Sequence, residues 1–235
     1  MQYTAIIGAM DIEVEGLRER LDGAQPISTG QLGFPLCAGV LGRTPVLLAK
    51  CGIGKVNAAL CTQYLIDHFP VRALINSGVA GALGPQVNPG DLVVSHAALH
   101  HDVDVSFFGY PKGVVPGLNV GRFPADQKLV QCAVGEARRV LDKDRVHQGL
   151  IVSGDRFVAE GRDKQAILEN FPDALCVEME GSAIAQVAYQ NKVPFVILRA
   201  MSDHADDSAR ADYETYLKRT IPVLNEIVTG MVAKL

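Results

Sequence analysis

Apolar and polar positions divide the chain into short apolar runs and longer segments of helical periodicity. The apolar runs cover residues 3–9, 45–50, 73–77, 91–95, 147–153, 174–179 and 194–201, and they predict buried β-strands. Between the runs, apolar residues recur every three or four positions. This spacing predicts helices opening at Asp11, over 54–68 and 126–142, after Glu180 and around 217–228. The alternation predicts one α/β domain over residues 1–235, a three-layer α/β/α sandwich with a central mixed, largely parallel sheet.

Glycine and proline concentrate in one segment, residues 109–124. This composition predicts a long surface loop between two elements of the sandwich. Loops of such length in compact domains usually carry a function or an interface.

Composition narrows the class of protein. The net charge is −4 and no three Lys or Arg residues are consecutive, which argues against nucleic acid or an anionic membrane as a partner. The five cysteines are odd in number and contain no Cys-x-x-Cys, so we expect reduced thiols in a cytoplasmic protein. We expect neither a signal peptide nor a membrane span, because the first strand has no basic flank and every apolar run is short.

Acidic residues stand at the ends of three predicted strands. Asp11 and Glu13 follow the first, Glu178 and Glu180 the sixth, and Asp203 the seventh. Carboxyl ends of strands are where open α/β sheets bind ligands, so the three clusters predict a site for a polyhydroxylated, nitrogen-bearing substrate. Acidic residues also favour the first turns of helices. We favour that structural role for Asp11 and Glu178, while the residues alone leave both roles open for the other three.

Other motifs have simpler explanations than ligand chemistry. Gly78-Val79-Ala80-Gly81 would let a ligand approach the backbone, but a tight turn explains the motif as well and is favoured on its own. Cys51-Gly52-Ile53-Gly54-Lys55 lacks the first glycine and the final Ser or Thr of a phosphate-binding loop. The His100-His101-Asp102 run has no second cluster at ligand spacing, so we expect no metal site. By default, Phe157 belongs in the core and Arg199 pairs with a carboxylate.

Taken together, the motifs resemble the purine nucleoside/uridine phosphorylase superfamily and, within it, the 5′-methylthioadenosine/S-adenosylhomocysteine nucleosidases. The resemblance spans essentially the whole chain. It is carried by the order and spacing of the segments 6–14, 51–56, 76–81, 101–105, 108–110, 149–155, 177–180 and 199–203. It implies a nucleoside phosphorylase-like fold and hydrolysis of the N-glycosidic bond of methylthioadenosine, S-adenosylhomocysteine and 5′-deoxyadenosine, as in methionine salvage, with no cofactor.

The resemblance also implies a role for each catalytic position. Asp203 would protonate N7 of the departing adenine, which requires a raised pKa. Glu13 would hold and deprotonate the attacking water. Glu180 would accept hydrogen bonds from the ribose hydroxyls above Met179, and Arg199 would help to position the water and Glu180.

Further positions would bind the substrate or complete its pocket from a second subunit, which implies a homodimer. Phe157 would stack on adenine, and the Val158 backbone would read its edge. The remaining implied substrate contacts are Met10, Ile53, Val79, Ala80, Gly81, Ser202 and Tyr213, and those from the partner subunit are Val105, Phe108 and Pro116. Family members often carry Ser where Val79 stands and Phe where Tyr213 stands, so the preferred 5′ substituent stays open.

Three alternatives remain at this stage. A phosphorylase of the same fold would need cationic groups for phosphate, yet residues 8–13 carry none and place a carboxylate there. A hydrolase of 6-amino-6-deoxyfutalosine would share the adenine and ribose sites. A binding protein without turnover would typically have lost one catalytic carboxylate, whereas Glu13, Glu180 and Asp203 are all present.

Overall fold

The protein, described from a computed structural model, contains one ten-stranded sheet. The structure describes residues 2–207 and 209–235, with the backbone alone for 209–215. The strands are β1 (Tyr3–Gly8), β2 (Asp22–Ile27), β3 (Leu36–Leu41), β4 (Thr44–Lys50), β5 (Val71–Ala82), β6 (Leu92–His100), β7 (Phe123–Pro124), β8 (Val146–Ser153), β9 (Ala174–Glu178) and β10 (Phe195–Asp203). All seven predicted strands are present. β2, β3 and β7 were not predicted. Most residues of β2 are exposed and no apolar run marks it, β3 is only partly buried, and β7 has two residues.

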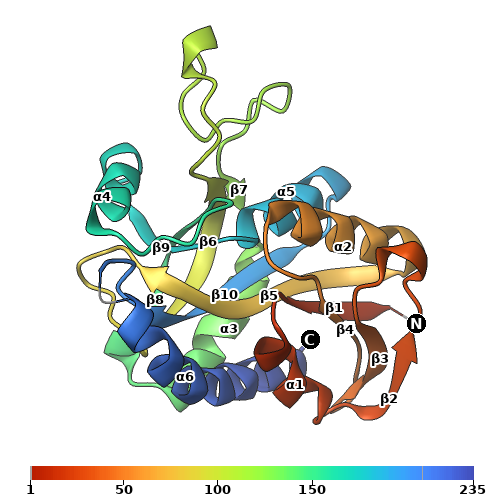
Figure 1. The fold of residues 1–235 in the computed structure, drawn as a ribbon. Helices are drawn as coiled ribbons and strands as arrows, with labels where there is room; N and C mark the ends of the chain where they lie inside the picture. Colours follow the sequence, from red (N-terminus) through yellow and green to blue (C-terminus); the bar gives the residue numbers. More distant parts are fainter. Residues whose placement is uncertain (1, 208) are drawn as a thin grey trace.

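Helices cover both faces of the sheet, as the fold-class prediction requires (Figure 1). They are α1 (Asp11–Arg18), α2 (Lys55–His68), α3 (Gln127–Val140), α4 (Gly161–Asn170), α5 (Gly181–Asn191) and α6 (Ala209–Val232), with short 3₁₀ turns η1 (Gly30–Leu32), η2 (Ser106–Phe108) and η3 (Lys143–Arg145). α2 packs against α5 on one face, while α6 packs against α1 and α3 on the other. α4 was not predicted, because Ile167 is its only buried apolar residue.

The strand pairing confirms a mixed sheet. β4, β1, β5 and β10 are parallel neighbours, and so are β6, β8 and β9. Antiparallel pairings of β10 with β6 and of β5 with β9 join the two groups into a closed ring of strands. β2 and β3 extend the other end as an antiparallel ribbon. Closure of the ring brings the carboxyl ends of β5, β9 and β10 close to one another.

The glycine- and proline-rich segment 109–124 is a long loop, as predicted, and ends in β7. Together with η2 it extends away from the sandwich (Figure 1). Its one pairing before β7 is an isolated bridge between Val115 and Val120.

All five cysteines are free thiols, and Cys51, Cys61 and Cys176 are buried. In the described part of the chain, no helix is long and apolar enough to cross a membrane.

Candidate active site

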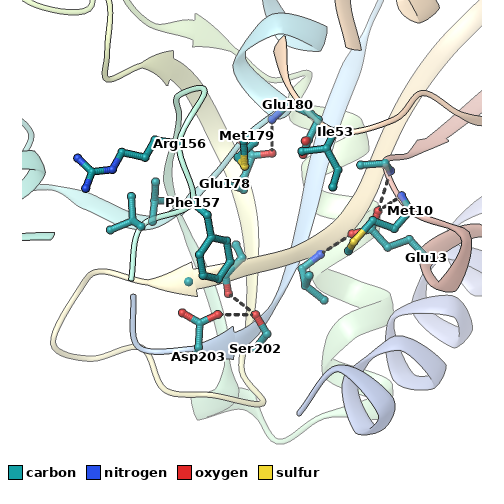
Figure 2. A pocket seen from close by; sticks show the side chains of 16 residues that line it. Met10, Glu13, Ile53, Arg156, Phe157, Glu178, Met179, Glu180, Ser202 and Asp203 are labelled. Carbon is teal, nitrogen blue, oxygen red and sulfur yellow. Dashed lines mark hydrogen bonds between the residues drawn. The ribbon is translucent and has the colours of Figure 1, made fainter. Parts of the chain in front are cut away.

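A pocket opens where β1, β5, β9 and β10 end. Its walls are formed by Ala9, Met10, Glu13, Ile53, Val79, Ala80, Gly81, Arg156, Phe157, Val158, Val177, Glu178, Met179, Glu180, Ser202 and Asp203. Figure 2 shows Glu13 and Met10 at one end of the pocket and Asp203 with Ser202 at the other. Most of the predicted substrate-site residues therefore come together. The sequence assigned no site role to Ala9, Arg156 or Val177. Ala9 and Val177 lie within the family segments 6–14 and 177–180, and Arg156 belongs to no motif.

Glu13 is anchored at the end of β1 by backbone donors. One carboxylate oxygen, Oε2, accepts hydrogen bonds from Ala9 N at 2.6 Å and Met10 N at 3.0 Å, and Oε1 accepts one from Val79 N at 3.0 Å. The side chain is 3% exposed. Burial raises the pKa of Glu13, although Arg199 and the backbone donors oppose the increase. A buried carboxylate whose pKa lies above its usual range is suited to accept a proton near neutral pH.

Arg199 lies beneath the pocket, fully buried inside β10. Its Nη2 donates to Asn76 Oδ1 at 2.7 Å and forms an ion pair with Glu178, with Glu180 Oε2 at 3.8 Å. Burial would lower the pKa of Arg199, but the surrounding carboxylates outweigh burial and raise it. Nε and Nη1 make no hydrogen bond with a described residue, so these donors can bind water or substrate.

Glu178 has the structural role that we favoured and a second one that the sequence did not indicate. It ends β9 rather than lying in the first turn of α5, but it accepts hydrogen bonds from Glu180 N and Gly181 N at the start of that helix, where the dipole favours negative charge. The same carboxylate also binds Ser153 Oγ and Arg199. Asp11 has the structural role alone: its side chain is 80% exposed and pairs with Lys50.

Glu180 lines the pocket beside Met179, in the upper part of the view in Figure 2. Its Oε1 accepts a hydrogen bond from Gly54 N at 2.8 Å. Burial and the neighbouring Glu178 carboxylate raise the pKa of Glu180 to about 7, against the opposing effect of Arg199. Its position between Glu13 and Asp203 allows it to bind hydroxyl groups of a ligand that spans the pocket.

Asp203 ends β10 at the far side of the pocket and is 1% exposed. Its Oδ2 accepts a hydrogen bond from Ser202 Oγ at 2.7 Å, and Oδ1 accepts one from Ala205 N at 2.8 Å. Burial raises the pKa of Asp203, although these two donors oppose the increase. A carboxyl group in this environment holds its proton at a higher pH than an exposed aspartate does.

Phe157 is not a core residue, contrary to the default expectation for its type. It is 50% exposed and stands over Ser202 and Asp203 in the view of Figure 2. Val158, the next residue, is buried. Ile53, at the opposite rim, is 54% exposed. The two exposed apolar side chains leave an open mouth that a flat aromatic ligand could cover.

The Gly78-Val79-Ala80-Gly81 motif is not a tight turn, so that explanation was wrong. The four residues lie inside β5. A Cβ atom on Gly78 would collide with Arg199 Nη1 and Glu13 Oε1, and one on Gly81 would lie 2.9 Å from Asp203 Oδ1. Small residues are therefore required here because three charged side chains approach the strand closely.

Four predicted positions among the described side chains lie outside the pocket wall, and Arg199, beneath the pocket, is one of them. Val105, Phe108 and Pro116 belong to the extended segment, where Phe108 is 73% exposed. The side chain of Tyr213 is outside the described residues.

No metal-binding group of three or more His, Cys, Asp or Glu side chains occurs within residues 2–207 and 216–235. His100, considered above as a ligand, is buried and hydrogen-bonded to Gln186 Oε1 at 2.9 Å and Ser182 Oγ at 2.7 Å.

Comparison with known families agrees with this geometry. The sequence model of the Phosphorylase superfamily matches residues 3–233. The chain belongs to this superfamily. It is similar to the 5′-methylthioadenosine/S-adenosylhomocysteine nucleosidase of Anoxybacillus flavithermus, with 42% identity over 231 residues and 98% of both chains covered.

Two solved structures extend the similarity from the sequence to the fold. The Neisseria meningitidis nucleosidase of the same name, in complex with methylthio-immucillin-A, matches with a TM-score of 0.94, 41% identity and full coverage of both chains. The Colwellia psychrerythraea nucleosidase, in complex with adenine, matches with a TM-score of 0.93 and 37% identity, covering 99% of this chain and 95% of the other.

The charges in the pocket bear on whether the site suits phosphate or water as the attacking group. Among the described residues that line the pocket, Arg156 is the only cation, and it forms an ion pair with Asp163 at 2.5 Å. The end of β1, where a nucleophile would meet the sugar, carries the Glu13 carboxylate instead. Arg199, beneath the pocket, is already paired with Glu178 and Glu180, so the charges at this end suit water better than phosphate.

Proposed function

We propose that this chain hydrolyses the N-glycosidic bond of 5′-methylthioadenosine and S-adenosylhomocysteine, and also of 5′-deoxyadenosine. The products are adenine and the 5-thio-substituted ribose, or 5-deoxyribose in the third case. The observation that carries the proposal is the placement of two buried carboxyl groups, Glu13 and Asp203, at opposite ends of one pocket with Glu180 between them. The similarity to nucleosidases over nearly the full chain supports the same reaction.

The reaction needs a base at the sugar and an acid at the purine. Water attacks C1′ of the ribose while Glu13 accepts its proton, and the C1′–N9 bond breaks with its electron pair moving into adenine. Asp203 donates a proton to N7, which neutralises the departing base. The raised pKa values of Glu13 and Asp203 support both assignments. Arg199, whose Nη1 lies close to Glu13 across Gly78, supplies donors for the water and holds the carboxylate cluster together.

The other pocket residues bind the substrate. Glu180 accepts hydrogen bonds from the ribose 2′- and 3′-hydroxyls, with Met179 against the sugar. Phe157 stacks on adenine, and the Val158 backbone binds its edge. Val79, Ala80, Gly81 and Ser202 complete the floor, and Met10, Ile53 and Tyr213 surround the 5′ substituent.

A second copy of the chain completes the pocket in this proposal. Phe107 and Phe108 are 92% and 73% exposed on a segment that extends away from the sandwich, and such apolar exposure favours a protein partner. Val105, Phe108 and Pro116 would reach the partner's 5′ pocket. A monomeric mass by sedimentation at micromolar concentration would rule this out. The free state of all five thiols supports a cytoplasmic location.

The test is adenine release from methylthioadenosine in phosphate-free buffer and again with added phosphate. Release without phosphate, together with free methylthioribose, supports the hydrolase. Release only with phosphate, giving a sugar 1-phosphate, identifies a phosphorylase and overturns the role of Glu13. Absence of release in both buffers, with release from 6-amino-6-deoxyfutalosine, identifies a hydrolase with a different 5′ specificity. Binding without any release identifies a binding protein.

A further inference from the structure

Two loops and the first residue of α2 meet at a cluster of charged residues that the proposed reaction does not use. Lys55 begins α2, Asp102 follows β6, and Asp155 follows β8. Lys55 Nζ donates to Asp102 Oδ1 at 2.5 Å, and Asp155 N donates to Asp102 Oδ2 at 3.0 Å. Lys55 N donates to Asp155 Oδ1 at 2.8 Å. The three contacts close a ring that joins segments about 50 residues apart in sequence.

The ring supplies a helix cap that the helix itself lacks. Gly54 occupies the N-cap position of α2 and has no side chain to accept a hydrogen bond from the first turn. Asp155 provides the missing acceptor from 100 residues away in sequence. Its carboxylate also lies at the end of the helix where the dipole favours negative charge.

Two pocket walls are attached directly to this ring. The Gly54 N–H, next to the Lys55 N–H that Asp155 binds, donates to Glu180 Oε1 at 2.8 Å. Asp155 precedes Arg156, Phe157 and Val158, which line the pocket. Two consecutive backbone N–H groups at the start of α2 therefore bind two carboxylates. Gly54 N binds Glu180 in the pocket, and Lys55 N binds Asp155 in the ring. Burial would raise the pKa of Asp102, but the hydrogen bonds from Lys55 and Asp155 outweigh burial and lower it.

We propose that Lys55, Asp102 and Asp155 are positioning residues that hold the Gly54 N–H against Glu180 and hold Phe157 over the adenine site. This inference rests on the proposed function, because it names what the ring positions. Neither the backbone donors of Glu13 nor those of Asp203 belong to the ring. The ring therefore sets the affinity for the nucleoside and leaves the rate of bond cleavage unchanged.

The experiment compares Asp155→Ala with Asp155→Asn. Asparagine keeps an oxygen that can accept the Lys55 N–H, whereas alanine does not. We expect Asp155→Ala to raise KM for methylthioadenosine about five-fold, the effect of losing one cap, with kcat and its pH profile unchanged. Asp155→Asn should restore a KM close to that of the wild type. Asp102→Asn, which keeps one oxygen of the two, should give an intermediate KM.

Asp173→Ala is the matched control. It also removes a carboxylate from an inter-element ion pair, that with Arg122 at 2.6 Å, but no pocket residue is attached to it. We expect its KM to be that of the wild type. The proposal would be overturned if Asp155→Ala kept the KM of the wild type, or if Asp155→Ala and Asp155→Asn had equal effects. It would also be overturned if Asp155→Ala lowered kcat at constant KM.

Adenine affinity by calorimetry on the same variants separates this inference from the proposed function. If the wild type releases no adenine, the proposed function fails, and the binding constants still decide whether the ring positions the Phe157 wall. If Asp155→Ala does not fold, Asp102→Asn carries the same test.

Discussion

The raised pKa of Glu180 has a consequence for stability that can be measured without any substrate. Its carboxyl group is 5% exposed and lies close to Glu178, and both effects raise its pKa from 4.5 to about 7. The perturbation is Glu180→Gln, which removes the ionisable group. The glutamine oxygen can still accept the hydrogen bond from Gly54 N.

The sign follows from proton linkage. A carboxyl whose pKa is higher in the folded protein favours folding in its protonated form. That contribution is complete below the unfolded value of 4.5 and is lost as the pH rises through about 7. The full shift corresponds to about 3 kcal/mol, at about 1.4 kcal/mol per pH unit. Between pH 5 and 8, the wild type should therefore lose about 2–3 kcal/mol of unfolding free energy that Glu180→Gln retains.

The assay is urea denaturation of both proteins at pH 5, 6, 7 and 8, with the difference in unfolding free energy plotted against pH. Glu15→Gln, which replaces an exposed carboxylate paired with Arg18, is the control and should give a flat difference. The reasoning is refuted if the difference in unfolding free energy between the wild type and Glu180→Gln stays constant with pH to within about 0.5 kcal/mol. That margin is the usual size of surface effects.

Further predictions concern the acid, the floor and the mouth of the pocket. Asp203→Asn should lower kcat about 10²- to 10⁴-fold while calorimetry shows methylthioadenosine binding retained; a fully active variant would exclude Asp203 as the acid. Gly78→Ala should lower the unfolding free energy by about 1–3 kcal/mol, because the new Cβ meets Arg199 and Glu13. The control Gly135→Ala lies at an open helical position and should raise the unfolding free energy by about 0.5–1 kcal/mol. Equal urea denaturation midpoints for the two variants would contradict this prediction. Phe157→Ala should weaken adenine binding by about 1–3 kcal/mol in calorimetry, and an unchanged affinity would exclude stacking.

Much of the fold was predictable because buried strands and amphipathic helices leave local periodicities in the sequence. The runs at 73–77 and 194–201 are the middle strands β5 and β10, and the helical spacing at 54–68 is α2. β2 and α4 were not predictable in this way, since few of their residues are buried. Closure of the strand ring was also hidden, because pairing between β10 and β6 depends on segments about 100 residues apart.

The site was predictable in part. Strand ends followed by acids indicated where ligands bind, and the family resemblance selected Glu13, Glu180 and Asp203 from the other carboxylates. Residues whose role depends on distant partners were missed. The sequence predicts for Glu178 only a structural role at the start of a helix. Its contact with Arg199 forms only when β9 and β10 come together in the fold.

The sequence by itself determined the α/β class, the strand ends that carry acids, and membership of a family, because each is written in local pattern or in the order of motifs. Tertiary structure alone decided the environment of each acid. Asp11 and Glu13 are two residues apart, yet one is exposed beside Lys50 and the other is buried among three backbone N–H groups. Desolvation and hydrogen bonding depend on what packs around a side chain, and that packing is contributed by residues far away in the sequence.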